Sequence, residues 1–215
     1  MICVIFFSKL DQCIPLVLLT PSPQPSPQTF STFHSSLLTL HLSSPSYGKQ
    51  TGFSDWRRRG YDVYGSYRND EEKALLEGKT KSFFLEFSER ETLSKRLLDF
   101  ASETGGFEYV IHCAGITRPE RIEEFYEGNV EFTDFFIHEL LRTQPAFKKF
   151  VFISSLQALG PGDPLTMEPI TELTTPKPFT PYGISKWEAE KRIRAIPGLD
   201  WIIFRPTSVY GPRDT

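Results

Sequence analysis

The sequence predicts an α/β protein with a doubly wound parallel sheet, and three observations support this class. From Gly60 onward, short apolar segments of strand length alternate with longer segments of helical character. Cap and turn residues separate them: Asn69 or Asp70 is suited to begin the first helix, and Pro197 with Gly198 is suited to end the last. The 215 residues, 39% of them hydrophobic, are enough for one domain with a sizeable core.

The expected elements follow in alternating order from residue 61. Apolar runs predict strands at 61–67, 82–86, 109–112, 150–154 and 201–205, and the segments between them predict helices at 70–77, 90–104, 121–142 and 182–195. The apolar residues of the third helix fit a buried face rather than a cofactor site; they are Phe125, Val130, Phe132, Phe135, Phe136, Leu140 and Leu141. Helices between consecutive strands indicate a parallel sheet that is covered on both faces.

Two segments carry a pattern that is suited to proton transfer. FVFISSLQALG (150–160) places Ser155 at the end of an apolar strand, and PYGISKWEAEK (181–191) places Tyr182 and Lys186 four residues apart. In a helix that spacing puts both side chains on one face, one turn apart. A nearby ammonium lowers the pKa of a phenol, so Tyr182 can serve as a general acid or base. The Ser155 hydroxyl can hold a substrate carbonyl or alcohol against that phenol.

Together with YVIHCAG (109–115), YEGNVEFT (126–133) and FRPTSVYGPRD (204–214), these segments resemble an extended short-chain dehydrogenase/reductase. That family includes the NAD(P)-dependent sugar epimerases and dehydratases, and its members are often homodimers. The resemblance runs from about Gly60 to the last residue. It implies a Rossmann-like fold and hydride transfer between the nicotinamide and a carbon that bears oxygen. In this scheme Tyr182 moves the proton, Ser155 orients the oxygen, Lys186 bonds the nicotinamide ribose, and Asn129 lies behind the active site near the lysine.

The resemblance also implies residues that contact the cofactor. Glu86 would lie near the adenine, and the small residues after the fourth strand of the family fold would run beneath the nucleotide, where the backbone must approach closely. The remaining contacts would come from Ser154, which can share or take the role of Ser155, and from the loop at the nicotinamide end. The full expected set is Arg68, Glu86, Cys113, Ala114, Gly115, Ser154, Tyr182, Lys186, Pro206, Thr207 and Val209. His112 is interpreted as a packed residue rather than a catalyst.

The end of the 61–67 strand bears on the choice of cofactor. NAD-selective folds place a carboxylate there against the ribose hydroxyls, and here Arg68 occupies about that position. A guanidinium pairs well with a 2′-phosphate, so NADP is favoured over NAD. The alternatives are that Arg68 is a solvated residue at a strand end, or that Asp70 reaches the ribose.

The first 55 residues do not follow the pattern of the rest. Residues 21–45 are dominated by Pro, Ser, Thr and Gln, so residues 1–55 are expected to be a disordered or non-native extension and residues 56–215 a partial NAD(P)-binding domain. No G-x-x-G-x-x-G precedes Gly60. The expectation is therefore that the first strand, the Gly-rich turn and most of the first helix are replaced by unrelated sequence, and that the substrate region after the sixth strand is also missing. The apolar start of the chain is interrupted by Lys9 and Asp11, and it is too short to span a bilayer.

Composition limits the kinds of partner. A net charge of −3 gives no electrostatic reason to expect nucleic acid or an anionic membrane. Cys3, Cys13 and Cys113 show neither a disulfide framework nor metal-ligand spacing, so no metal is expected and a reducing, cytoplasmic location is the natural interpretation.

Three functions remain open from the sequence. The expected substrate is a nucleotide sugar or a related small molecule, handled by an epimerase, or else the chain is a simple carbonyl or steroid-type reductase. A dehydratase is disfavoured, because Leu156 and Gln157 stand where that subgroup carries an acidic pair beside the catalytic serine. The third alternative is an inactive fragment or a non-catalytic nucleotide-binding relative, since loss of a central strand would expose sheet edges and remove the phosphate site.

Overall fold

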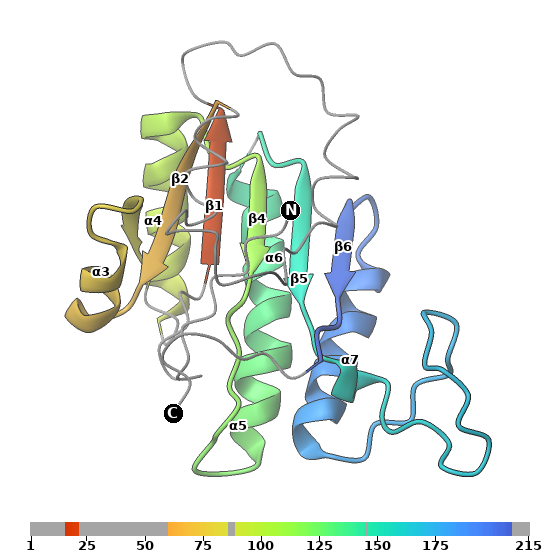
Figure 1. Cartoon of the computed structure of the whole chain (residues 1–215). Coiled ribbons are helices and arrows are strands. Elements are labelled where there is room, and N and C mark those ends of the chain that lie inside the picture. The colour runs from red at the N-terminus through yellow and green to blue at the C-terminus, as the bar shows by residue number, and fades with distance from the viewer. Residues whose placement is uncertain (1–15, 22–59, 86–88, 145, 208–215) are drawn as a thin grey trace, which may run out of the picture.

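The computed structural model describes residues 16–21, 60–85, 89–144 and 146–207. Its strands form one sheet in the order β3-β2-β1-β4-β5-β6 (Figure 1). The strands are β1 (Leu16–Pro21), β2 (Tyr61–Tyr67), β3 (Lys81–Phe84), β4 (Tyr109–His112), β5 (Lys149–Ile153) and β6 (Trp201–Phe204). β2 pairs parallel with β3, and β4, β5 and β6 are parallel to one another. The predicted fold class is confirmed, and the strand order is that of the doubly wound dinucleotide-binding fold.

β1 is the exception to the parallel arrangement. It occupies the central place expected to be vacant, but it runs antiparallel to both neighbours, with Leu16 beside His112 and Val17 beside Gly65. The open edges expected on β2 and β4 are thus paired, because the backbone groups of an extended segment satisfy a strand edge in either direction. The six residues of β1 also depart from the expectation that residues 1–55 lie outside the fold. For the rest of that segment, the boundary at residue 55 stays a prediction.

The helices agree with the sequence patterns, with one interruption. They are α3 (Asp70–Leu76), α4 (Arg90–Thr104), α5 (Glu123–Tyr126), α6 (Phe132–Thr143) and α7 (Pro181–Ala195), with a 3₁₀ turn η4 (Leu156–Ala158). The continuous helix expected at 121–142 is instead broken by a π-helical turn, η3 (Glu127–Glu131). Asn69 is the cap of α3, because its Oδ1 accepts a hydrogen bond from the Glu72 N–H at 2.9 Å.

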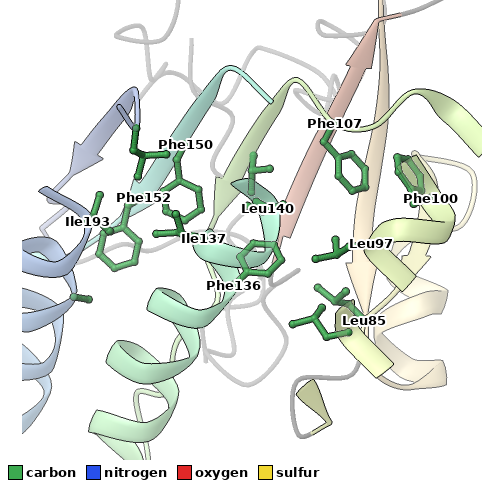
Figure 2. Packing of buried hydrophobic residues seen from close by; sticks show 14 residues of the cluster. Leu85, Leu97, Phe100, Phe107, Phe136, Ile137, Leu140, Phe150, Phe152 and Ile193 are labelled. Carbon is green, nitrogen blue, oxygen red and sulfur yellow. The ribbon is translucent and has the colours of Figure 1, made fainter. Parts of the chain in front are cut away.

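The core lies mainly between the sheet and three helices, α4, α6 and α7 (Figures 1 and 2). Successive residues of a strand point to opposite faces, so Phe150 and Phe152 of β5 pack toward these helices while Val151 and Ile153 pack in the cluster on the other face, which includes Leu76 of α3. Burial on both faces explains why β4 and β5 are buried along their whole length. None of the helices in the described part of the chain is long and apolar enough to cross a membrane.

Candidate active site

Ser155 and Tyr182 belong to two turns that pack directly on each other. Ser155 follows β5 and caps η4, where its Oγ accepts a hydrogen bond from the Gln157 N–H at 3.2 Å. Thr180 caps α7: its Oγ1 accepts from the Gly183 N–H at 3.0 Å and lies 3.0 Å from Gln157 Oε1, to which it donates. A Cβ added at Gly183 would lie 2.4 Å from the Gln157 carbonyl oxygen, so only glycine permits this approach. The turn that carries Ser155 is thereby held against the first turn of α7.

Lys186 lies one turn after Tyr182 and is buried, with 3% of its surface exposed. Its Nζ donates a hydrogen bond to the Ile153 carbonyl at 2.9 Å and lies 4.6 Å from the centroid of the Phe152 ring. These contacts fix the ammonium at the carboxyl end of β5. Tyr182 is half-buried beside Phe125, with the ring centroids 5.9 Å apart. The geometry expected from the four-residue spacing is present.

Asn129 ties the loop after β4 to α7. Its Oδ1 accepts from the Ile116 N–H at 2.7 Å, and its Nδ2 donates to the Ile116 carbonyl at 3.0 Å and to Ser185 Oγ at 2.9 Å. The Ser185 hydroxyl in turn donates to the Tyr182 carbonyl at 2.8 Å. The π turn inserts an extra residue into the helix at this point, a distortion that is often found at functional sites.

Gly115 lies where Asn129 and Lys186 meet. A Cβ at this position would lie 2.9 Å from Asn129 Oδ1 and 3.3 Å from Lys186 Nζ. The carboxyl end of β4 therefore joins the same cluster as the end of β5 and the start of α7. In parallel α/β sheets, ligands bind at this edge.

His112 lies next to this cluster but is closed off from solvent. It is wholly buried, with its ring among those of Phe132, Phe136, Phe150 and Phe152. Its Nε2 is 3.0 Å from Thr133 Oγ1. Burial, together with a smaller contribution from the nearby Lys186 ammonium, lowers the pKa of His112 to about 3. The imidazole is therefore neutral at neutral pH.

Ser154, next to Ser155, has a different partner. Its Oγ donates a hydrogen bond of 2.6 Å to Glu190 Oε1, inside the protein. Sequence reasoning missed Glu190. Its signal was the spacing: Tyr182, Lys186 and Glu190 recur every four residues, so they lie close to one face of α7. Burial acts to raise the pKa of the Glu190 carboxyl, but hydrogen bonds from Arg205 and Ser154 outweigh it and hold the pKa below its usual value.

The expected cofactor residues fall into three groups. Cys113, Ala114 and Gly115 follow β4, and Pro206 and Thr207 follow β6, so all five lie after parallel strands that end at one edge. Arg68 follows β2, where its backbone N–H and guanidinium both donate to the buried carboxylate of Glu72. Glu86 and Val209 lie outside the described residues. In the described part of the chain, no group of three or more His, Cys, Asp or Glu side chains is arranged to hold a metal.

β1 does not supply the phosphate-binding turn of a dinucleotide site. In the parallel arrangement the carboxyl end of the central strand leads into a Gly-rich turn and a helix N-terminus. Here the register places Leu16, the first residue of β1, beside His112 at the carboxyl end of β4. The direction of β1 is thus reversed relative to what such a turn requires.

Residues 53–215 match the model of a protein family described as "NAD dependent epimerase/dehydratase family". Among curated proteins, none matches the chain.

Three solved structures illustrate the likeness in fold. The UDP-glucuronic acid 4-epimerase from Bacillus cereus in complex with NAD is 19% identical with a TM-score of 0.51, and the match covers 66% of this chain and 43% of that one. WbmG from Bordetella bronchiseptica, in complex with NAD and UDP, is 20% identical with a TM-score of 0.58, covering 75% and 50%. The dTDP-glucose 4,6-dehydratase DesIV from Streptomyces venezuelae, a double mutant with NAD and DAU bound, is 23% identical with a TM-score of 0.52, covering 64% and 42%. The chain thus matches half or less of the length of these proteins.

Proposed function

The chain belongs to the NAD dependent epimerase/dehydratase family, and from this premise we propose that its site transfers a hydride between a nicotinamide cofactor and a carbon bearing oxygen. The observation that carries the proposal is the convergence of the Ser155 turn, Tyr182, Lys186 and Asn129 at the carboxyl ends of β4 and β5. A half-buried phenol one turn from a fixed ammonium is equipped to move a proton.

Each side chain has a definite part in the proposed reaction. The Tyr182 hydroxyl gives a proton to the substrate oxygen or takes one from it. Lys186, held by Ile153, keeps a positive charge near that phenol and so favours the phenolate. Ser155 donates a hydrogen bond to the same substrate oxygen and orients it. Asn129 holds Ser185, and through it the Tyr182 backbone, so that the first turn of α7 keeps its place.

The residues present fit the nicotinamide half of the cofactor. The small residues Ala114 and Gly115 suit a ligand that passes close to the backbone, and the absence of a side chain at Gly115 leaves room for Asn129 Oδ1 and Lys186 Nζ. The nicotinamide, when bound, supplies the hydride or accepts it. For the pyrophosphate half the sequence offers no Gly-rich turn, and β1 runs in the opposite direction. Arg68 favours NADP over NAD, although its guanidinium is engaged by Glu72 and a 2′-phosphate would have to compete for it.

A nucleotide sugar is the substrate class that we propose. Two of the structures similar in fold are a UDP-glucuronic acid 4-epimerase and a protein in complex with UDP. Leu156 and Gln157 replace the acidic pair expected of a dehydratase, and the Gln157 side chain is occupied by Thr180. Epimerisation or simple carbonyl reduction therefore suits this site better than dehydration does.

A second candidate function follows from β1. Its reversed direction is the specific observation in favour of a chain that keeps the catalytic residues but holds no cofactor. This alternative predicts that neither NADH nor NADPH binds.

The two functions are separated by titrating the purified chain with NADH and NADPH while the nicotinamide fluorescence is followed, and then assaying UDP-glucose and UDP-glucuronic acid for turnover. The proposal expects saturable binding and turnover of at least one sugar nucleotide or, failing that, of a simple carbonyl compound. Tyr182→Phe should lower turnover roughly 10²–10⁴-fold with little change in cofactor affinity. Tyr126→Phe is the matched control, because this exposed tyrosine lies on α5 and its hydroxyl accepts a hydrogen bond from Arg192 at 3.0 Å. Equal turnover by Tyr182→Phe and the wild type would refute the assignment.

A further inference from the structure

A buried carboxylate connects the elements that carry the candidate site. Glu190 on α7 is fully buried, and its two oxygens accept four hydrogen bonds. Oε1 accepts from Ser154 Oγ at 2.6 Å and Arg205 Nε at 2.9 Å, and Oε2 accepts from Arg205 Nη2 at 2.6 Å and Arg194 Nη2 at 2.9 Å. A buried ion is tolerated when its charge is paired and its lone pairs are satisfied, as here. Removal of one partner leaves the others uncompensated.

Backbone bonds extend this network to both sides of Ser155. The Ser154 N–H donates to the Phe204 carbonyl at 2.7 Å, and the Leu156 N–H donates to the Pro206 carbonyl at 2.9 Å. Arg205 lies between these two carbonyl residues. Its side chain therefore donates hydrogen bonds to Glu190 of α7, while the carbonyls of its two neighbours accept hydrogen bonds from the residues that flank Ser155.

Building on the proposed function, we propose that Glu190 is a positioning residue that sets where Ser155 stands relative to Tyr182. Glu190 lies two turns after Tyr182 on the same helix. Its ion pair with Arg205 therefore connects the helix that carries the phenol to the segment that holds the Ser155 turn. The same carboxylate engages the Ser154 hydroxyl, which leaves Ser155 as the serine that holds the substrate oxygen. Glu190 does not touch the reacting atoms.

The role is one of geometry, and its loss has a specific signature. A misplacement of about 1 Å at a reacting group can lower a rate on the order of 100-fold. In Glu190→Gln one oxygen becomes an NH₂ group, which cannot accept a hydrogen bond. A donor of Arg205, Arg194 or Ser154 would then face another donor and lose its acceptor. The backbone hydrogen bonds of Ser154 and Leu156, on either side of Ser155, should then break more often, while those in the centre of the sheet stay formed.

The test is amide hydrogen exchange on the full chain, read residue by residue, for the wild type, Glu190→Gln and Glu188→Gln. Exchange at Ser154 and Leu156 should rise at least roughly tenfold in Glu190→Gln, with Val110 unchanged. Glu188→Gln is the matched control on the same helix, because Glu188 is a partly exposed partner of Lys191. It should match the wild type. An equal rise at Val110, or no rise at Ser154 and Leu156, would overturn the proposal.

Kinetics supply the second readout. With the substrate that the wild type turns over, Glu190→Gln should lower kcat about 10- to 100-fold with little change in KM. An unchanged kcat would overturn the positioning role. If Glu190→Gln does not fold, Arg205→Lys takes its place, since it keeps the charge but loses the two-pronged contact. A wild type without hydride transfer refutes the proposed function, and the exchange comparison then decides the placement of Ser155 independently.

Discussion

Gly183→Ala offers a direct test of how closely the Ser155 turn packs on α7. The new Cβ would lie 2.4 Å from the Gln157 carbonyl oxygen and 2.9 Å from Thr180 Oγ1, whereas real Cβ contacts essentially never fall under 3.0 Å. The obstructing atom is backbone, so η4 itself must move by about 0.6 Å, the difference between 2.4 and 3.0 Å. Overpacking of this kind costs about 1–3 kcal/mol.

A gain in helix propensity opposes this cost. Alanine is favoured over glycine by up to about 1 kcal/mol in a helix interior, and less in the first turn, where Gly183 lies. With a cost of about 2 kcal/mol and a gain of about 0.5 kcal/mol, the middle of each range, the net loss is about 1.5 kcal/mol. This corresponds to a fall in Tm of roughly 3–6 °C for a chain of this size.

Thermal unfolding followed by circular dichroism measures the effect, with Gly128→Ala as the control. A Cβ at Gly128 would also be crowded, at 2.5 Å, but by the end of the Ile116 side chain, which can rotate away. Gly128→Ala should therefore lose less stability than Gly183→Ala. A Gly183→Ala protein that melts at or above the temperature of the wild type would show that the packing of η4 on α7 has been misjudged.

Two further predictions concern charge. The pKa of His112 is lowered to about 3 in the folded protein, from 6.5 in the unfolded chain, so the unfolded chain binds the extra proton between these values. Stability should fall by up to about 1.4 kcal/mol per pH unit on this account as the pH drops from 6.5 towards 3. Urea unfolding of His112→Phe should show a shallower dependence over that range, and identical slopes would contradict the assignment. Glu72→Gln should release the Arg68 guanidinium from its carboxylate and tighten binding of NADPH relative to NADH, roughly tenfold or about 1.4 kcal/mol. Fluorescence titration measures the ratio of the two dissociation constants. Equal changes for NADPH and NADH would show that Arg68 does not select between the two cofactors.

Local spacing was enough to predict most elements and the central pair of the site. Tyr182 and Lys186 share a helix face because four residues make about one turn, whatever surrounds the helix. Asn69 caps α3 for an equally local reason, since its side chain reaches an N–H three residues ahead. The alternation of the β5 side chains between the two faces of the sheet follows from the pleat of a strand. The catalytic and cofactor roles of these residues stay predictions.

The sequence by itself therefore determined the α/β class, the succession of strands and helices along the chain from residue 61 onward, and the Tyr-x-x-x-Lys geometry. Only the tertiary structure decided that β1 enters the centre of the sheet in reverse, that a π turn breaks the helix at Asn129, and that Glu190 engages Ser154 from 36 residues away. These features depend on pairing between segments that are distant in the sequence. Such segments come together where the rest of the fold has unpaired backbone groups, room for a side chain or a buried charge that needs a partner. No short-range period encodes them.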